Sequence, residues 1–180
     1  MSEFVEFPKI ARLSRPCLIT EKIDGTNAQI FIGEDGTVLA GSRTRWVTPE
    51  DDNYGFAAWV AERAEVIRTA LGPGRHFGEW WGQGIGRGYG LTERRFSLFN
   101  ANRWEGKALP AGVSVVPVLY RGEFSTEAAD YCLKQLIAGG SRAAPGFMRP
   151  EGIVVYHIAG GVGFKKTLGG DGAKGARSDG

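Results

Sequence analysis

The stretch best suited to chemistry is ITEKIDGTNA, residues 19–28, in which one lysine ends an apolar, strand-like run. Lys22 is followed at once by Asp24 and Gly25, a pair that is typical of a tight turn. A lysine at such a position is held firmly, and nearby positive charge would make its amine lose a proton more readily and become a nucleophile. The pattern Lys-x-Asp-Gly-x-Asn therefore indicates a lysine nucleophile, against the alternative of an ordinary hairpin corner.

The densest glycine patch is GQGIGRGYG, residues 82–90. A dinucleotide-binding or phosphate-binding loop would need a following helix or a Gly-Lys-Ser/Thr ending, and the strand-like run RRFSLF follows instead. We interpret the patch as a mobile loop that faces a substrate or connects two strands.

Short β-rich runs alternate with two helical segments. The expected strands are CLIT, NAQIFI, TVLAGS, RHFGEWW, RRFSLF, VSVVPVLY, GIVVYHI and GVGFKK. Apolar periodicity predicts helices over 54–71 and about 125–138, with Asp52 or Asn53 as the cap of the first. This order predicts an α+β fold with mostly antiparallel sheets and flanking helices, not a β-α-β alternation.

Composition favours one domain in a reducing compartment. The chain has 180 residues, 42% of them hydrophobic, which predicts a folded domain over 1–168 and a flexible Gly-rich tail over 169–180. Two distant cysteines, Cys17 and Cys132, are expected to be reduced packing residues. Without a leader or a membrane-length apolar run, we expect a cytoplasmic protein with no membrane partner, encoded by a cell or by a phage or virus.

Six stretches in chain order resemble the motifs of the covalent nucleotidyltransferases, the superfamily of DNA ligases, RNA ligases and mRNA capping enzymes. They are the run around Lys22, Ser42-Arg43, FGEW at 77–80, FSLFN at 96–100, EGIVV at 151–155 and GFKK at 163–166. The first and fifth of these are specific, and the others gain weight from their order. The resemblance implies a nucleotidyltransferase domain, ATP-grasp-like, of the ligase and capping-enzyme type.

Within that superfamily, EKIDGTN and residues 82–91 look like the ATP-dependent RNA ligases of the RNA-repair and RNA-editing type, because DNA ligases and capping enzymes usually carry arginine where Asn27 stands. Two features depart from the family. Its last motif usually spaces two lysines by one residue, whereas Lys165 and Lys166 are adjacent here and Thr167 takes the spaced position. The chain also lacks the C-terminal domain of larger ligases, so we expect a minimal form whose grip on RNA a partner protein could supply.

The resemblance implies a three-step reaction. Lys22 would attack the α-phosphorus of ATP, expel pyrophosphate and form a lysine–AMP bond. The AMP would then pass to an RNA 5′-phosphate, and a 3′-hydroxyl would displace it to join the two ends. Asn27, beside the nucleophile, would serve the nucleotide site and the later steps.

The same resemblance assigns the charged groups. Asp24, Glu79 and Glu151 would surround hydrated Mg²⁺ or Mn²⁺, mostly through water, as small hard cations prefer. Lys165, together with Lys166, would neutralise the α-phosphate as charge shifts.

The remaining roles concern the nucleotide. Phe99 and Val154 would sandwich adenine, and the backbone of Thr20 and Glu21 would read the edge of the base. Arg43 would touch the ribose or the incoming 5′-phosphate.

Other readings of these residues remain open. Taken alone, Glu79 is more often a salt-bridged strand residue, and Phe96 and Phe99 are more often core. Trp80 and Trp81 are neighbours on one strand, so one is expected in the core and the other at a surface. The functional alternatives are a capping-type guanylyltransferase using GTP, a DNA-sealing enzyme, and a nucleotide-binding or RNA-binding module without catalysis.

Overall fold

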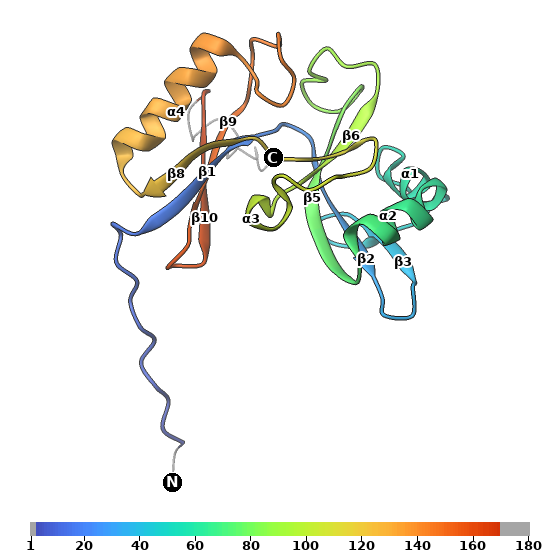
Figure 1. Cartoon of the computed structure of the whole chain (residues 1–180), viewed down its shortest axis with the longest axis horizontal. Coiled ribbons are helices and arrows are strands. Elements are labelled where there is room, and N and C mark those ends of the chain that lie inside the picture. The colour runs from blue at the N-terminus through green and yellow to red at the C-terminus, as the bar shows by residue number, and fades with distance from the viewer. Residues whose placement is uncertain (1–2, 170–180) are drawn as a thin grey trace, which may run out of the picture.

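Two β-sheets stand next to each other in the computed structural model, which describes residues 3–169 (Figure 1). The first sheet has the strand order β10-β9-β1-β8, formed by β1 (Pro16–Lys22), β8 (Val118–Glu123), β9 (Gly152–His157) and β10 (Val162–Thr167). The second has the order β4-β3-β2-β5-β6-β7, formed by β2 (Thr26–Ile32), β3 (Val38–Gly41), β4 (Trp46–Val47), β5 (Gly74–Gly82), β6 (Arg94–Leu98) and β7 (Val113–Val115).

Every neighbouring pair in these sheets is antiparallel except β6 and β7, which are parallel. The predicted α+β class with mostly antiparallel sheets is confirmed. Within residues 3–169, no helix has the length and apolar character that crossing a bilayer requires. The tail predicted over 169–180 lies, apart from its first residue, outside the described residues.

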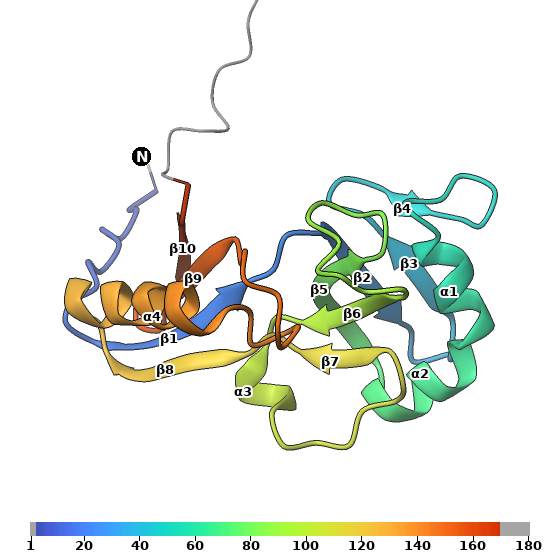
Figure 2. The same ribbon diagram turned by 90° about the horizontal axis from the view of Figure 1, so that it is seen from above.

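Each sheet buries one face under helices and leaves the other face open. The helix α4 (Thr126–Gly139) covers the four-stranded sheet, where Leu136 packs with Ile19 and Ile153. The helices α1 (Phe56–Glu62) and α2 (Ala64–Leu71) cover the six-stranded sheet, on the side of Ile30 and Trp80 (Figure 2). The uncovered faces are therefore free to line a site between the sheets.

The chain passes between the two sheets at two adjacent points. It first crosses through the turn between β1 and β2, which places Lys22 at one end of the crossing and Thr26 at the other. It crosses again at Val116 and Pro117, between β7 and β8. The prediction of one continuous strand over VSVVPVLY was therefore wrong: proline has no N–H to continue the ladder, and the run divides between two sheets.

The helix predicted over 54–71 forms as two helices. The break falls at Arg63, whose φ of −115° and ψ of 11° lie outside the helical range. The expected cap is present in a modified form, because the Asp52 carboxylate accepts hydrogen bonds from the N–H groups of Ala57 at 2.7 Å and Ala58 at 3.0 Å. The second predicted helix is confirmed as α4, and the short α3 (Ala101–Trp104) was not foreseen.

Both neighbouring tryptophans of β5 are buried, which contradicts the expectation that one of them lies at a surface. Trp80 and Trp81 are each 1% exposed. Trp80 packs into the core with Phe56, while Trp81 points to the opposite face and lies under Tyr89 of the glycine-rich loop. The loop thus supplies a third, smaller core on the otherwise uncovered face of the six-stranded sheet, which strand alternation alone could not reveal.

Replacing Asp52 by alanine should lower the free energy of unfolding by about 1–2 kcal/mol, because two N–H groups of the first turn of α1 lose their acceptor. Urea unfolding at neutral pH measures the change. The exposed Glu50 provides the control, and Glu50→Ala should unfold like the wild type. Equal stability of Asp52→Ala and wild type would show that water replaces the cap at no cost.

Candidate active site

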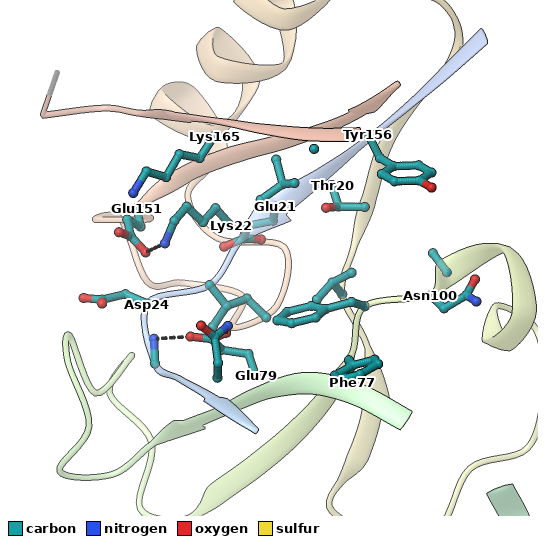
Figure 3. A pocket seen from close by; sticks show the side chains of 18 of the residues that line it. Thr20, Glu21, Lys22, Asp24, Phe77, Glu79, Asn100, Glu151, Tyr156 and Lys165 are labelled. Atoms are coloured by element: carbon teal, nitrogen blue, oxygen red, sulfur yellow. Dashed lines mark hydrogen bonds and ion pairs between the residues drawn. The ribbon is translucent and has the colours of Figure 1, made fainter. Parts of the chain in front are cut away.

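One open cavity of about 1680 Å³ lies between the uncovered faces of the two sheets (Figure 3). Of the twelve residues that the sequence assigns to a site, eleven line it: Thr20, Glu21, Lys22, Asp24, Asn27, Arg43, Glu79, Phe99, Glu151, Val154 and Lys165. Figure 3 shows Lys22, Glu151 and Lys165 toward one end of the cavity and Phe77, Asn100 and Tyr156 toward the other. The charged and aromatic groups are therefore separated within one space.

Lys22 forms an ion pair with Glu151 at the charged end of the cavity. Lys22 Nζ lies 2.6 Å from Glu151 Oε2, and the two side chains are 23% and 4% exposed. The pairing of Lys22 with Gly152 in the β1–β9 ladder sets this contact. Gly152 has φ 156°, and a Cβ there would lie 2.2 Å from the carbonyl oxygen of Lys166, so glycine is needed for β10 to approach. The amine is thus held at a fixed point of the cavity wall.

Glu79 fastens the turn that follows the lysine. It lies on β5, is 8% exposed, and accepts hydrogen bonds from Gly25 N at 3.1 Å and Asn27 Nδ2 at 3.2 Å. A Cβ on Gly25 would lie 2.5 Å from the carbonyl oxygen of Trp80, so only glycine lets the turn come this close. Burial raises the pKa of Glu79 to about 7, although the positive charge of Lys22 and the Gly25 N–H act in the opposite direction.

Asn27 links Glu79 to a cation at the rim. Its Oδ1 accepts hydrogen bonds from Arg43 Nε at 2.8 Å and Arg43 Nη2 at 2.6 Å, while its amide nitrogen donates to Glu79. Arg43 is exposed and follows β3, the second strand of the predicted hairpin, and its contact with the ribose or the 5′-phosphate stays a prediction. The Arg43 guanidinium is thereby held in one orientation at the rim of the cavity.

The glycine-rich loop between β5 and β6 contacts the nucleophile turn from the other side. The Asp24 N–H donates to the Tyr89 hydroxyl at 2.7 Å, and Arg87 Nε lies 3.3 Å from Asp24 Oδ2. Gly86 has φ 51°, and a Cβ there would lie 2.8 Å from the Asp24 carboxylate. Burial raises the pKa of the Tyr89 hydroxyl, which keeps it protonated. The loop connects two strands, as predicted, and also braces Asp24, which the sequence did not indicate.

The three predicted metal carboxylates share the cavity without forming a compact ligand set. The negative charges of Glu151 and Asp24 both raise the pKa of Glu79, so a divalent cation among the three would relieve their repulsion. Within the described part of the chain, no three His, Cys, Asp or Glu side chains lie close enough to hold one ion together. This arrangement fits contact with a hydrated Mg²⁺ or Mn²⁺ through water, which stays a prediction.

The two adjacent lysines of β10 point in opposite directions. Lys165 lines the cavity, whereas Lys166 Nζ lies 2.6 Å from Asp130 Oδ1 on α4, on the far side of the sheet. Consecutive side chains on a strand alternate between faces, so adjacent lysines cannot both reach one phosphate. Thr167, two residues after Lys165, returns to the cavity side. The structure therefore brings Lys165 to the site and leaves Lys166 outside it.

Phe99, which directly follows β6, and Val154, on β9 of the other sheet, both line the cavity, as the predicted sandwich of adenine would require. Phe77 was missed by the sequence reasoning: it lies beside Phe99, which donates its N–H to the Phe77 carbonyl oxygen at 2.9 Å. The two rings are 53% and 40% exposed. Tyr156, one alternation beyond Val154 on β9, also lines this end. Alternation along β5 and β9 was the available signal for both missed aromatics.

Glu21 has a structural role at the back of the cavity. Its side chain is 1% exposed and accepts hydrogen bonds from Ser141 Oγ at 2.6 Å, Arg142 N at 2.7 Å and Ala143 N at 3.0 Å. Its own N–H donates to the Pro117 carbonyl oxygen at 2.9 Å. That N–H is therefore engaged within the protein, and the role of the Thr20 and Glu21 backbone in reading adenine stays a prediction.

The resemblance to covalent nucleotidyltransferases implies a lysine nucleophile surrounded by acidic residues, and the structure brings Lys22, Glu79 and Glu151 to one cavity. The model of the RNA ligase family matches residues 15–167. The chain therefore belongs to the RNA ligase family.

Solved structures of variants of Naegleria gruberi RNA ligase share this fold. One without ligand has a TM-score of 0.57 at 20% identity, one with AMP and Mn has 0.55 at 19%, and one with ATP and Mn has 0.60 at 19%. Each match covers 86% of this chain and 50% of the other, so this chain spans about half the length of those proteins. A search of curated proteins gave no match.

The raised pKa of Glu79 predicts a pH-dependent stability. Between the ordinary glutamate value of 4.5 and about 7, the folded protein retains a proton that the unfolded chain has lost. The free energy of unfolding of the wild type should therefore fall relative to Glu79→Gln across this range, by on the order of 3 kcal/mol in total.

Urea unfolding of both proteins in EDTA, at half-unit steps from pH 4 to 8, measures this difference. The exposed Glu50→Gln serves as the control and should parallel the wild type throughout. A constant difference between wild type and Glu79→Gln would mean that Glu79 ionises in the fold as it does in the unfolded chain.

Proposed function

We propose that the protein is an ATP-dependent RNA ligase that joins RNA 5′-phosphate and 3′-hydroxyl ends through a lysine–AMP intermediate. The observation that carries the proposal is the Lys22–Glu151 ion pair, held in a cavity that also contains Glu79 and Lys165. Membership of the RNA ligase family supports the reaction class. ATP, AMP and Mn in the structures of the Naegleria protein support ATP and a divalent cation as the partners of this site.

In the first step, Lys22 Nζ forms a bond to the α-phosphorus of ATP while the bond to the leaving pyrophosphate oxygen breaks. The amine must lose a proton to attack, and Glu151 Oε2, at 2.6 Å, is placed to accept it. Lys165, on the same side of the cavity, offers positive charge to the phosphate oxygens as charge moves to the leaving group. A bound Mg²⁺ or Mn²⁺ near Asp24, Glu79 and Glu151 would add charge neutralisation of the triphosphate.

The aromatic end of the cavity suits the base of ATP. Phe99 directly follows β6 of one sheet and Val154 lies on β9 of the other, so a planar base between them would meet one ring face and one aliphatic face. Phe77 widens the aromatic wall beside Phe99. Charged residues at one end and aromatic residues at the other match a nucleotide triphosphate lying along the cavity.

The two steps that involve RNA take place at the rim of the cavity. Arg43, held by Asn27, offers an oriented guanidinium to the 5′-phosphate that receives AMP. The phosphate oxygen attacks the α-phosphorus, releases Lys22 and forms an RNA–AMP anhydride. The 3′-hydroxyl then attacks the RNA 5′-phosphorus, expels AMP and forms the phosphodiester. The first of these exchanges frees the lysine amine, and the second releases AMP.

The cysteines support an intracellular setting. Cys17 on β1 and Cys132 on α4 are free thiols in one buried cluster, and burial raises the pKa of each. A buried thiol of raised pKa is protonated at neutral pH and reacts slowly. Two free thiols without a disulfide are typical of proteins from reducing compartments, and we infer that the protein acts inside cells.

Incubation with α-labelled ATP and Mg²⁺, followed by denaturing electrophoresis, should leave label on the wild type and none on Lys22→Ala or Lys22→Arg. Arginine keeps the charge but cannot present a neutral amine. Lys165→Ala should label on the order of a hundredfold more slowly, as for loss of one transition-state donor. Lys166→Ala should label normally because its side chain pairs with Asp130 on the far face of the sheet.

Label that persists in Lys22→Ala would disprove the assigned nucleophile. Equal loss in Lys165→Ala and Lys166→Ala would show that the facing of β10 changes when ATP binds. Preference for GTP over ATP in the same assay would indicate a capping-type guanylyltransferase instead of an RNA ligase.

Tyr89→Phe should slow lysine adenylylation by about three- to tenfold, the effect of losing one hydrogen bond of ordinary strength. The phenyl ring keeps its packing on Trp81 but leaves the Asp24 N–H without its acceptor. Single-turnover rates at saturating ATP measure the change, with Tyr131→Phe on the exposed side of α4 as the control. Unchanged rates in Tyr89→Phe would mean that the loop contributes packing alone.

A further inference from the structure

The open face of the six-stranded sheet carries a surface of aromatic and cationic side chains that begins in the cavity, where Arg75 and Phe77 line the wall, and continues outward to Phe31 and Trp46. The strand register defines it. Asn27 pairs with Glu79 in the cavity, and the next pairs outward on the same face are Gln29 with Phe77 and Phe31 with Arg75. Successive pairs on one face are separated by about 7 Å along the strands. The surface is thus a direct continuation of the wall that holds the nucleophile turn.

Trp46 closes this surface at the edge strand. Gln29 pairs with Gly41, and Gly41 pairs with Trp46 on β4. A Cβ on Gly41 would lie 3.1 Å from Trp46 Cε3 and 2.8 Å from Gln29 Cγ, so the glycine allows the indole to lie close over the sheet. Trp46 is 44% exposed. We refer to Phe31, Trp46, Arg75 and Phe77 as the aromatic face.

Arg75 is held among the rings. Its guanidinium carbon lies 4.9 Å from the centre of the Phe31 ring and 5.4 Å from that of Trp46, and Nη1 donates to Gln29 Oε1 at 3.2 Å. The Phe31 and Trp46 rings are tilted by 54° at 6.2 Å. These contacts fix an exposed cation between aromatic groups at little further entropic cost on binding.

The charge on this face is of one sign. The two outward rows, read from the register, are Phe77, Gln29, Gly41 and Trp46, and then Arg75, Phe31 and Leu39. Neither row contains an acidic residue, whereas Arg75 and the neighbouring Arg43 are cations. α1 and α2 pack on the opposite face, so they do not cover these side chains. A polyanion with exposed rings complements such a surface better than an acidic or aliphatic protein segment does.

We propose that the aromatic face binds the unpaired nucleotides next to the RNA end that is joined, with a base stacked on Trp46 and the phosphate backbone beside Arg75 and Arg43. The inference rests on the proposed function, which places an RNA end at Arg43 and Lys22. Rings of this kind stack on bases of single strands, because bases within a duplex already stack on their neighbours. The face therefore favours single-stranded RNA over a duplex end.

The proposal can be tested by measuring the binding of a single-stranded RNA dodecamer by fluorescence anisotropy. The RNA carries a 5′-phosphate and a fluorescent label at its 3′ end. Trp46→Ala should raise Kd roughly tenfold, in line with the loss of one base–aromatic stack. Trp46→Phe should recover most of the affinity. Tyr131→Ala, which removes a 58% exposed ring from α4, should bind like the wild type. Lysine adenylylation by Trp46→Ala should be unchanged, since Trp46 does not line the ATP cavity.

Tryptophan emission gives a second readout that a purely structural role would not change. Trp80, Trp81 and Trp104 are buried, and Trp59 lies on α1, on the opposite side of the six-stranded sheet, so Trp46 is the tryptophan that RNA should quench. The quenching should disappear in Trp46→Phe although that variant still binds the dodecamer, and a duplex of the same sequence should quench the wild type less. Arg75→Gln should reduce the slope of log K against log salt by about one.

The outcomes separate this inference from the proposed function. Absence of lysine–AMP in the wild type would overturn the proposed function. Normal adenylylation together with wild-type RNA affinity in folded Trp46→Ala would overturn the aromatic face alone, as would equal losses in Trp46→Ala and Tyr131→Ala. If Trp46→Ala fails to fold, persistence of quenching in Trp46→Phe, or an unchanged salt slope in Arg75→Gln, would overturn it instead.

Discussion

The site depends on a single buried carboxylate, that of Glu79. It belongs to the six-stranded sheet, yet its hydrogen bonds reach the turn that leads out of the four-stranded sheet. Gly25 and Asn27 are fixed by it, and Arg43 is fixed in turn by Asn27. An acid that is costly to ionise thus positions the residues on either side of the lysine, so the same group that weakens the fold at neutral pH organises the chemistry. Functional sites commonly contain groups that lower the stability of the fold while they position the reactive residues.

Much of this arrangement was readable from the sequence because turns and strand alternation are local. The Asp24-Gly25 pair predicted the turn, and the β-rich runs predicted most of the strands. What failed needed tertiary information. The burial of Trp81 depends on a loop that folds back over β5, and the division of VSVVPVLY depends on the two sheets on which its halves pack.

The candidate site shows the same division between local and distant information. Lys165 and Lys166 are neighbours in sequence, but their side chains leave opposite faces of β10. The Lys166 side chain pairs with Asp130 on the face away from the cavity. Glu21 and Lys22 are also adjacent, and one is a structural anchor for residues 141–143 while the other faces the cavity. A sequence motif includes both residues of such a pair because they are adjacent in the chain. The direction of each side chain follows from the pleat and from what packs beneath it.

The two crossings between the sheets have a mechanical consequence. The β1–β2 turn and the Val116-Pro117 segment lie together, tied by the bond from Glu21 N to Pro117 O and by the small core of Ile23, Trp81, Tyr89 and Val116. The crossings lie beside the turn that Glu79 holds after Lys22. Arg121 of β8 adds a link away from them, to Asn102 and Glu105 at α3. Opening of the cavity by rotation about the line through the crossings would break that link, and it would separate Tyr156 from Phe77 more than Lys22 from Glu79.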